Sequence, residues 1–407
     1  MTDNSHDSGT RELALLLTLG EQAIQRVPLT HVRSAAKEIR ASRRLLIVRG
    51  PRGVGKTTLL QQHAKLHFDP ARRAYFSLDD VAFRRLDLVE AVHALQSSGR
   101  NQLVLDEVHR YPDWEAALKT CFDRYPQIRL LVTGSSMLNL QRGGSDLSRR
   151  AYILDLPRLS FREFLIFKKE IDYESVTLDQ ICRDHQSLHN ELARLHGDFE
   201  LHFENYLRYG TYPALLDVPE DAGTYLRGTT VQTIDRDIAP VLDLKPATLA
   251  KLHKLLAIVA ASAPFKPTIS KLAQQMETSR ELIVEMLNAL DLAGIIRRFW
   301  YSGGGDNRLA KPDKIYLADT ALAYAYELEP NRGTIRESFF FAQFTPSTQL
   351  ALSQRGDFTL GKRTFELGGR GKGFSQIAEL ADGYLAIDTF EGGEGHRIPL
   401  YLFGFLR

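Results

Sequence analysis

The chain has 407 residues, of which 43% are hydrophobic and 25% charged, so it is a folded globular protein and too long for one ordinary hydrophobic core. Its formal net charge of +2 excludes binding of nucleic acid or anionic lipid through the whole surface and leaves only a local patch for such a partner. Cys121 and Cys182 form neither a metal-binding spacing nor a disulfide framework, and no apolar run is long enough to span a bilayer, which together favour a cytoplasmic protein.

A polar segment opens the chain. Residues 1–10 lack a basic stretch followed by an apolar one, so they do not resemble a signal peptide, and we expect a disordered tail there. Leucine and alanine then recur at helical spacing over residues 12–25. The ordered part of the chain is therefore expected to begin near residue 11.

Short apolar segments alternate with segments of helical spacing between residues 45 and 156. Each apolar segment has the length and the flanking turns of a buried strand. Strands that are apolar throughout are typical of a parallel sheet that helices cover on both faces, so the sequence predicts an α/β fold. The expected strands are residues 45–48, 73–78, 103–105, 130–132 and 152–156.

A glycine-rich turn joins the first of these strands to the next helix. Its sequence, Gly50-Pro51-Arg52-Gly53-Val54-Gly55-Lys56-Thr57, matches the pattern G-x-x-x-x-G-K-[ST] without a gap. The glycines allow the backbone to curl until several N–H groups face one centre, where the start of the helix also attracts phosphate. We expect ATP to bind here, with Lys56 on its β- and γ-phosphates, the Thr57 hydroxyl on Mg²⁺ and Thr58 completing the set. The alternative, a glycine turn without a ligand, is disfavoured because the motif lies between a strand and a helix.

Two acidic residues end the third expected strand. Asp106 and Glu107 follow an apolar run, and ligands of parallel sheets bind at the carboxyl ends of the strands. The sequence therefore assigns Asp106 to Mg²⁺, through water, and Glu107 to the general base that polarises the attacking water. The alternative is a pair of solvated acids, and the upstream glycine-rich loop argues against it.

Three further residues are candidates for the same site. Thr133 ends the next strand and could contact the γ-phosphate or the attacking water, or else belong to a helix cap within residues 133–136. Arg149 and Arg150 precede the last strand, and one of them, with Arg150 as the candidate, could neutralise transition-state charge within the chain or on a neighbouring subunit. A solvated surface pair is the alternative for both arginines.

The chain resembles a group of prokaryotic AAA+-superfamily ATPases that combine an N-terminal P-loop ATPase module, a winged-helix middle and a degenerate restriction-endonuclease-like, or PD-(D/E)XK, C-terminal domain. Residues 154–164 resemble the family's Pro-Leu-Ser-Phe-x-Glu-Phe signature, with Arg158 inserted before the leucine, and residues 206–213 resemble its Tyr-x-x-x-Gly-x-Tyr-Pro segment. The other segments that carry the resemblance are residues 45–58, 103–110 followed by Trp114, and 130–136.

The resemblance implies a domain order for the whole chain. An AAA+-type ATPase domain is expected over residues 11–165, a helical region over 166–265, a winged-helix domain over 266–330 and a degenerate nuclease-like domain over 331–407. AAA+ proteins often form rings, so the family also implies that the chain could form a homo-oligomer.

The pattern between residues 269 and 317 is that of a helix-turn-helix followed by a β wing. In DNA-binding proteins of this type the second helix enters a groove, yet here it carries Glu281 and Glu285, which phosphates would repel. The alternative is a winged helix used for packing or for contact with a protein. The wing is more basic, and its cationic residues are Arg297, Arg298, Arg308, Lys311 and Lys314.

The last 70 residues resemble a nuclease fold in the order of their acids. By that resemblance Glu337, Asp357 and Glu366 correspond to the positions that hold Mg²⁺ and activate water. The lysine expected two residues after the last acid is Gly368, and Lys372 follows in a basic loop and could replace it. The missing lysine favours a decayed nuclease fold kept for binding or assembly over a working nuclease.

The sequence as a whole predicts a Mg²⁺-dependent ATPase whose nucleotide state changes how its C-terminal half engages a partner, with DNA or a protein as the candidates. One alternative is a nucleotide-gated binding module with negligible turnover. The other is an ATP-regulated nuclease.

Overall fold

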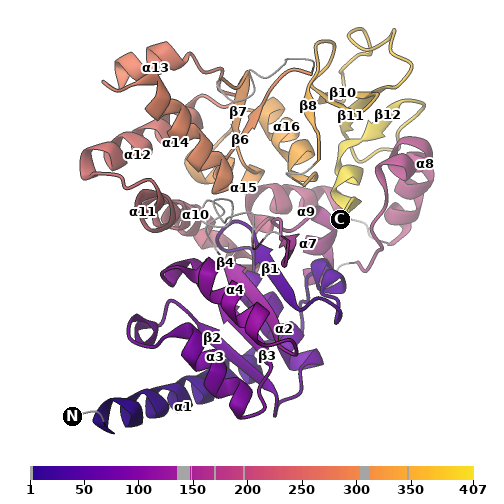
Figure 1. Cartoon of the computed structure of the whole chain (residues 1–407). Helices are drawn as coiled ribbons and strands as arrows, with labels where there is room; N and C mark the ends of the chain where they lie inside the picture. The colour runs from indigo at the N-terminus through magenta and orange to yellow at the C-terminus, as the bar shows by residue number, and fades with distance from the viewer. Residues whose placement is uncertain are drawn as a thin grey trace. The chain divides into compact units, whose positions relative to one another are not determined.

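The computed structural model describes residues 3–134, 147, 149–168, 171–195, 198–302, 311–345 and 348–407. The chain divides into two compact units, Met1–Pro157 and Arg158–Arg407 (Figure 1). The boundary follows strand β5 (Tyr152–Asp155) almost directly. Residues 158–165, which the sequence assigns to the ATPase domain, belong to the second unit.

Five parallel strands form the sheet of the first unit, in the order β2-β3-β4-β1-β5 (Figure 1). The predicted parallel α/β sheet is confirmed, and each strand lies within two residues of its expected bounds. Strand β4 lies between β1 and β3, and all three are parallel. Their carboxyl ends therefore lie side by side at one end of the sheet. The strands are β1 (Leu45–Arg49), β2 (Arg73–Ser77), β3 (Gln102–Asp106), β4 (Arg129–Gly134) and β5.

Helices cover both faces of this sheet, as strands without a polar face require. Successive residues of a strand point to opposite faces. On β1, Ile47 joins the core on the side of α3 (Leu88–Ser97) and α4 (Trp114–Arg124), whereas Val48 packs on the side of α2 (Lys56–His67). The short 3-10 helices of the unit are η1 (Ser34–Glu38), η2 (Val81–Arg84) and η3 (Val108–Arg110).

The first helix, α1 (Asp3–Arg26), is longer than the sequence predicts. Residues 1–10 are expected to be disordered, yet from Asp3 onward they belong to this helix. Leu16 and Ile24 bury one face of α1 in the unit. Once such a helix exists, each added residue gains a hydrogen bond without a new nucleation cost, so the helix can extend beyond its buried part.

A glycine lets α1 lie directly against β2, the edge strand. A Cβ at Gly20 would lie only 2.1 Å from the carbonyl oxygen of Tyr75. The helix backbone therefore approaches the strand backbone more closely than any side chain would permit. This contact covers a sheet edge whose unpaired groups would otherwise invite pairing with another chain.

Helices dominate the first part of the second unit. A capping box begins the first of these helices: the Ser160 hydroxyl accepts a hydrogen bond from the Glu163 N–H (3.2 Å), and the Glu163 carboxylate accepts one from the Ser160 N–H (3.3 Å). The α-helices of this part are α7 (Phe161–Phe167), α8 (Leu178–Leu195), α9 (Phe199–Asn205), α10 (Ala222–Gln232), α11 (Ala239–Val241) and α12 (Pro246–Ala261). Shorter π-helical and 3-10 elements are η4 (Tyr206–Gly210), η5 (Pro213–Leu215), η6 (Pro219–Asp221) and η7 (Thr233–Ile238).

The two signature-like segments of this unit contact each other around a buried ion pair. The Leu159 N–H donates to the Thr211 carbonyl oxygen (3.0 Å). The guanidinium of Arg158 lies 2.5 Å from the Asp319 carboxylate and donates to the Tyr212 hydroxyl (2.7 Å). Asp319 is fully buried, and a buried carboxylate without a partner would be costly, so the contact with Arg158 stabilises its charge. The inserted Arg158 is therefore part of the unit's framework.

The helices and strands expected between residues 269 and 317 are present. Helices α13 (Ile269–Gln275) and α14 (Arg280–Leu292) precede two short antiparallel strands, β6 (Ile296–Phe299) and β7 (Lys314–Leu317). The Ser279 side chain caps α14 by accepting a hydrogen bond from the backbone, as the turn residues predict. The assignment of these elements to a winged-helix domain stays a prediction.

A second five-stranded sheet ends the chain, in the order β12-β11-β10-β9-β8 (Figure 1). Strands β10, β11 and β12 are parallel, whereas β8, β9 and β10 are antiparallel. The elements are α15 (Thr320–Tyr326), α16 (Arg332–Ala342), β8 (Ala351–Leu352), β9 (Phe358–Leu360), β10 (Arg363–Gly369), β11 (Gly383–Asp388), β12 (Arg397–Pro399) and the 3-10 helix η9 (Leu400–Phe405).

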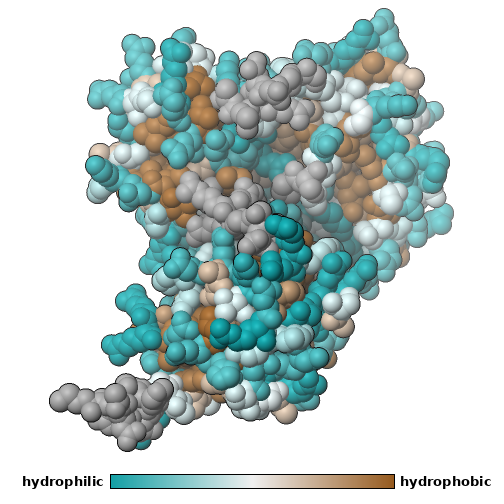
Figure 2. All heavy atoms as spheres, viewed as in Figure 1, coloured by the Kyte–Doolittle hydropathy of each residue, from teal (hydrophilic) through white to brown (hydrophobic). Residues whose placement is uncertain are grey.

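Hydrophilic side chains cover most of the face drawn in Figure 2, and hydrophobic residues appear between them. Among the residues that the structure describes, the large hydrophobic side chains with the greatest exposure are Val81 and Leu328, at 68% and 92%. No helix in the described ranges is both long enough and apolar enough to cross a membrane.

Replacing Gly20 with alanine is expected to destabilise the first unit. The new Cβ would collide with the Tyr75 carbonyl oxygen, and overpacking of this kind costs about 1–3 kcal/mol. Gly228 also lies inside a helix but has no atom within 4 Å of the position of a Cβ, so Gly228→Ala is the matched control and should not destabilise its helix. Unfolding in guanidinium chloride, followed by circular dichroism, measures both variants. Equal stability would show that α1 does not depend on this close approach.

Candidate functional site

The glycine-rich loop begins where β1 ends, at the carboxyl edge of the first sheet. Gly53 and Gly55 have φ angles of 83° and 90°, a left-handed conformation that glycine adopts without strain. Gly50 is needed for a different reason, because a Cβ there would lie 2.2 Å from the carbonyl oxygen of Leu156. Glycine is thus required at all three positions, at Gly53 and Gly55 for the backbone conformation and at Gly50 for lack of space. Pro51, Arg52 and Thr57 are partly exposed, and Thr58 is exposed on the first turn of α2.

Side chains hold the loop from both sides. The Lys56 ammonium donates to the carbonyl oxygens of Gly50 (3.0 Å) and Pro51 (2.8 Å), so this buried cation lies across the start of the loop. Val54 is fully buried, and its carbonyl oxygen accepts a hydrogen bond from Arg33. The loop is therefore a rigidly supported turn, with a cation at the beginning of helix α2.

Three hydroxyl groups converge on one carboxylate at the end of β3. The Thr57 hydroxyl lies 2.9 and 3.0 Å from the two carboxylate oxygens of Asp106. The Tyr75 hydroxyl from β2 donates to the same carboxylate at 3.1 Å, and the Thr133 hydroxyl from β4 donates to it as well. The structure thus brings the predicted Thr57, Asp106 and Thr133 together, and it adds Tyr75, which the sequence analysis missed.

Burial controls the charge of Asp106. Its residue is 5% exposed, and the loss of hydration raises the pKa of its carboxyl group. The hydrogen bond from Thr133 opposes this shift, the neighbouring charge of Glu107 adds to it, and the bonds from Thr57 and Tyr75 oppose it again. A buried carboxylate surrounded by hydroxyl donors is held in one orientation, and a cation beside it would stabilise the charged form.

Glu107 has an unusual backbone conformation. Its φ and ψ of 54° and 40° are left-handed, which is uncommon and costly for a residue with a side chain. Its N–H donates to the Thr133 hydroxyl (3.1 Å), and its carboxylate lies 3.5 Å from Nε2 of His109. The turn directs the Glu107 side chain away from the direction that a continued strand would give it. Strained residues of this kind cluster at functional sites.

Thr133 lies in the site itself. Its hydroxyl accepts from Glu107 and donates to Asp106, so it connects the two acids. The alternative of a helix cap in residues 133–136 falls partly on residues 135 and 136, which lie outside the described ranges. Its predicted contact with a phosphate or a water stays a prediction.

Arg150 lies away from this site within its own chain. Its guanidinium forms a bidentate pair with Asp123, at 2.8 and 3.0 Å. It precedes β5, whose first residue pairs with Leu46 near the start of β1, whereas the loop follows the end of β1. The sheet edge with Arg150 and Arg149 is thus opposite to the loop, roughly 10–15 Å away along the strands. The pairing with Asp123 gives no support to a finger arginine acting within the chain, and the role of either arginine as a finger, within the chain or on a neighbouring subunit, stays a prediction.

The acids predicted for a nuclease-like site are close enough to affect one another. Burial raises the pKa of Glu337, Asp357 and Glu366, and the charge of Asp357 raises the pKa of both glutamates further. Yet each acid has a partner in the protein. Glu337 accepts from the Tyr316 hydroxyl, and Asp357 accepts from the Leu367 N–H (2.7 Å). In the described part of the chain, no group of three or more His, Cys, Asp or Glu side chains is arranged to hold a metal ion.

Lys372 lies close to Gly368, the position of the missing lysine. A Cβ at Gly368 would lie 2.4 Å from both Cβ and Cγ of Lys372, so the lysine stem occupies the space above the glycine. The Lys372 ammonium lies 2.5 Å from the Glu366 carboxylate, and this contact raises the pKa of Lys372. The Lys372 side chain thus lies beside Gly368 and forms an ion pair with Glu366, and its role as a replacement for the missing lysine stays a prediction. A nuclease function gains no support from this geometry.

The basic wing is largely engaged inside the second unit. Arg298 donates to Asp291 (2.9 Å), Arg297 lies over the ring of Phe299, and Lys314 is 3.8 Å from Glu337. Arg308 lies outside the described residues. Among the wing cations that the structure describes, Lys311 is exposed, and a role of the basic wing in binding stays a prediction.

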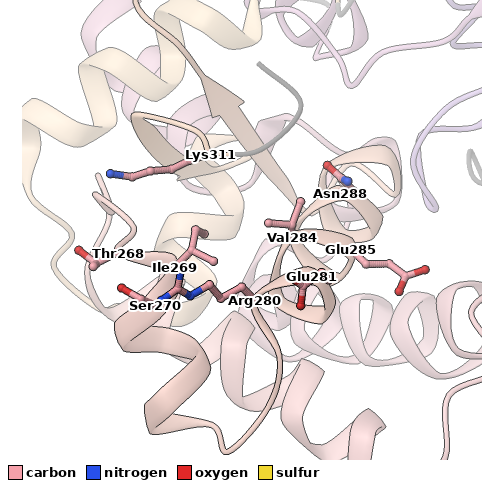
Figure 3. A pocket seen from close by; sticks show the side chains of 9 residues that line it. All are labelled: Thr268, Ile269, Ser270, Arg280, Glu281, Val284, Glu285, Asn288 and Lys311. Carbon is pink, nitrogen blue, oxygen red and sulfur yellow. The ribbon is translucent and has the colours of Figure 1, made fainter. Parts of the chain in front are cut away.

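A groove of about 650 Å³ lies beside α13 and α14 (Figure 3). Val284 and Ile269 form its apolar part, and the charged residues around it are Arg280, Glu281, Glu285 and Lys311. Two acids balance the two cations, so the groove has no excess of positive charge to attract a nucleic-acid backbone.

Comparisons with known proteins place a known domain over the candidate site. Residues 42–165 match a family model described as an AAA domain, and residues 200–332 match one described as a domain of unknown function (DUF8612). An uncharacterized protein of Methanocaldococcus jannaschii, MJ1637, is 29% identical over 285 residues, which are 67% of this chain. The match spans 60% of the length of that relative.

Among solved structures, the chain has a distant similarity to two further proteins. PCH-2 of C. elegans is 18% identical with a TM-score of 0.25, over 70% of this chain and 69% of that one. The Hsp104–ADP complex of S. cerevisiae is 16% identical with a TM-score of 0.30, over 64% of this chain and 38% of that one. TM-scores this low carry no structural argument, so the AAA assignment rests on the match over residues 42–165.

Replacing Asp106 with asparagine is expected to stabilise the protein at neutral pH in the absence of nucleotide and Mg²⁺. Because its pKa is raised, the folded state binds more protons than the unfolded chain between about pH 3.9, the unfolded value, and the raised pKa. Stability is therefore lost as the pH rises through this window, and the full penalty is present above it. Asp106→Asn removes the penalty, so its gain should be largest at pH 7 and vanish below about pH 4.

Asp123→Asn is the opposite control, because the hydrogen bond from Arg150 lowers the pKa of this exposed carboxyl group. Its loss should cost a little stability at pH 7 and nothing at low pH. Urea unfolding of both variants from pH 3 to pH 8 provides the measurement. A lower stability of Asp106→Asn at pH 7 would mean that the hydroxyl contacts outweigh burial.

Proposed function

We propose that the chain binds ATP with Mg²⁺ at residues 50–58 and hydrolyses it. The observation that carries the proposal is the contact of Thr57, the last residue of the loop motif, with the buried carboxylate of Asp106. In a phosphate-binding loop these two groups must adjoin, because one Mg²⁺ ion links them to the nucleotide. The match of residues 42–165 to an AAA domain agrees with this proposal.

The phosphates would bind at the centre of the loop. The left-handed Gly53 and Gly55 let backbone N–H groups face one side, and the first turn of α2 adds its unsatisfied N–H groups. Lys56 adds a full positive charge at the same place. Its ammonium donates to the carbonyl oxygens of Gly50 and Pro51, and a charged phosphate oxygen is a stronger acceptor than a neutral carbonyl.

The oxygen groups of Thr57 and Asp106 fit Mg²⁺. The ion prefers hard oxygen donors and usually takes one or two protein ligands, keeping water and substrate phosphates as the others. A site with three or more acidic or histidine ligands is therefore not required here. When bound, Mg²⁺ would neutralise charge on the phosphates, while Tyr75 and Thr133 keep the Asp106 carboxylate oriented.

Glu107 is the proposed general base. It follows Asp106 directly, and its left-handed backbone turns it out of the strand at the edge where the loop lies. A carboxylate there would take a proton from the attacking water, and the N–H bond to Thr133 holds the turn in place. Thr133 would orient the γ-phosphate or that water.

The second unit would respond to nucleotide state and engage a partner. DNA is the less favoured partner, because most of the described wing residues are engaged within the unit and the groove at α14 has balanced charge. Contact with a protein is the favoured mode. The rival function is a nucleotide-gated module with negligible turnover. Steady-state phosphate release, with and without duplex DNA, separates the two functions and tests DNA as an activator.

Lys56→Ala is expected to weaken nucleotide binding. Removing a charged hydrogen bond to phosphate costs about 1.5–3 kcal/mol, or roughly a 10- to 100-fold higher Kd. Lys65 lies on the same helix and also donates to two backbone carbonyls, at 2.7 and 2.9 Å, so Lys65→Ala is the matched control. Calorimetric titration with a non-hydrolysable ATP analogue and Mg²⁺ gives both Kd values. Unchanged affinity in the purified Lys56 variant would refute the site.

Glu107→Gln is expected to bind ATP normally and to hydrolyse it slowly. A positioned general base contributes roughly 10²- to 10⁴-fold to a rate, and glutamine cannot accept the proton. Single-turnover phosphate release gives the rate, and Glu90→Gln, an exposed glutamate on α3, is the control. Turnover at the wild-type rate in Glu107→Gln would remove its role as base and leave the binding site intact.

A further inference from the structure

Arg33 is a buried arginine that contacts the loop from outside. It directly precedes η1, its backbone is extended, and its residue is 4% exposed. One terminal nitrogen donates to the carbonyl oxygen of Val54 at 2.7 Å, and the other donates to the carbonyl oxygen of Pro157 at 2.8 Å. A single guanidinium therefore joins the middle of the loop to the last residue of the first unit.

The bond to Val54 orients a donor of the loop. The Val54 carbonyl and the Gly55 N–H belong to one planar trans peptide, so they point in opposite directions. With the carbonyl held by Arg33 on the outer side, the Gly55 N–H is directed to the inner side of the loop. Hydrogen bonds from a charged donor are about twice as strong as neutral ones, so Arg33 holds this peptide firmly against rotation.

The segment that leaves the first unit forms the outer wall of the loop. The Leu156 N–H donates to the carbonyl oxygen of Arg49 at 2.7 Å, and the Leu156 carbonyl lies so close to Gly50 that no Cβ fits between them. The next carbonyl, of Pro157, is bound by Arg33. Residues 156 and 157 thus touch the loop directly at its first glycine and, through Arg33, at Val54.

We propose that Arg33 is a positioning residue that holds the loop in its phosphate-binding shape and links that shape to residues 156 and 157. This inference rests on the proposed nucleotide site. A phosphate that pulls on the Gly55 N–H also pulls on the Val54 carbonyl, and Arg33 passes the change to Pro157. Nucleotide binding therefore tightens the chain segment that continues into the second unit.

The geometry requires two nitrogen atoms, and this distinguishes a bridge from a simple positive charge. Arg33→Lys keeps the charge but donates from a single nitrogen, so it loses the planar geometry in which two separate nitrogens of Arg33 reach the Val54 and Pro157 carbonyls. If Arg33 only attracted phosphate through its charge, lysine would restore binding. If Arg33 acts as a bridge, lysine leaves most of the defect.

Arg44 provides a matched control in the same unit. It also donates to two backbone carbonyls, of Phe122 and Tyr125, both at 2.8 Å. It precedes β1, so it lies at the sheet edge opposite to the loop. Arg44→Ala thus measures what the loss of a structural arginine does to this unit without touching the loop.

The experiment compares full-length wild type, Arg33→Ala, Arg33→Lys and Arg44→Ala. Titration with a non-hydrolysable ATP analogue and Mg²⁺ gives the affinity, and hydrogen exchange with and without the analogue gives the protection of the Leu156 amide. We expect the Kd to rise at least tenfold in both Arg33 variants and less than threefold in Arg44→Ala. We also expect the analogue to increase the protection of Leu156 in wild type and in Arg44→Ala but not in Arg33→Ala.

Separate outcomes overturn the two ideas. If wild type does not bind the analogue, the proposed nucleotide site fails. If wild type binds and Arg33→Ala matches Arg44→Ala in affinity, the site stands and the role of Arg33 fails. If the affinity falls but the protection of Leu156 still responds to the analogue, the link to residues 156 and 157 is wrong. The thermal stability of every variant is measured alongside. If Arg33→Ala and Arg44→Ala lose stability to the same extent, a larger loss of affinity in Arg33→Ala is not explained by unfolding.

Discussion

The candidate site depends on one buried carboxylate that four elements share. Asp106 ends β3, and it receives hydroxyl groups from the loop end at Thr57, from β2 at Tyr75 and from β4 at Thr133. A charge in the core without such donors would be too costly, so the strands must keep the order that brings their carboxyl ends together. The raised pKa of Asp106 means that the donors offset only part of the cost of burial. The folded protein thus retains a destabilised anion beside the loop, and a cation bound there would relieve it. If the proposed Mg²⁺ site is occupied, the energy lost by burying this carboxylate would be recovered in part when the ion binds.

Local patterns made the first unit predictable. The strands, the loop and the acids Asp106 and Glu107 follow from apolar runs, glycines and a contiguous motif, because each depends on neighbours in sequence.

Tyr75 and Arg33 could not be found in this way. Tyr75 reads as one more aromatic residue in a β-strand, and only the placement of β2 beside β3 brings its hydroxyl to Asp106. Arg33 contacts residues 21 and 124 positions away in sequence, so no local pattern reveals its partners. The helical Asp3–Thr10 segment differs from its prediction because polar composition does not prevent the extension of an anchored helix.

Several charged residues in the second unit pair with one another, which the sequence pattern alone does not show. The basic residues of the wing suggest a surface for nucleic acid, yet Arg298 pairs with Asp291 and Lys314 lies near Glu337. Likewise the acids at 357 and 366 resemble a catalytic set, and the structure gives them a backbone N–H and an ammonium group as partners. The close approach of Lys372 to Gly368 is a contact that spacing alone does not reveal. Sequence shows which charges exist, and only packing shows which of them are already neutralised.

The same reasoning applies to the point where the chain passes from one unit to the other. Pro157 is bound through its carbonyl by Arg33, and the next residue, Arg158, is bound through its side chain by Asp319 and Tyr212. The bond from Arg33 to Pro157 lies within the first unit, and the contacts of Arg158 lie within the second. Two consecutive residues are therefore each bound to their own unit. A flexible linker would dissipate a small displacement, since its dihedral angles absorb it at little cost. Residues anchored by charged hydrogen bonds cannot do so, because any rotation must break a bond to a buried group. Pro157 and Arg158 are thus each held by a charged hydrogen bond at the point where the chain leaves the first unit. If the proposed nucleotide site is occupied, a change in the loop would meet this anchored segment first, which is why the proposal for Arg33 concerns residues 156 and 157.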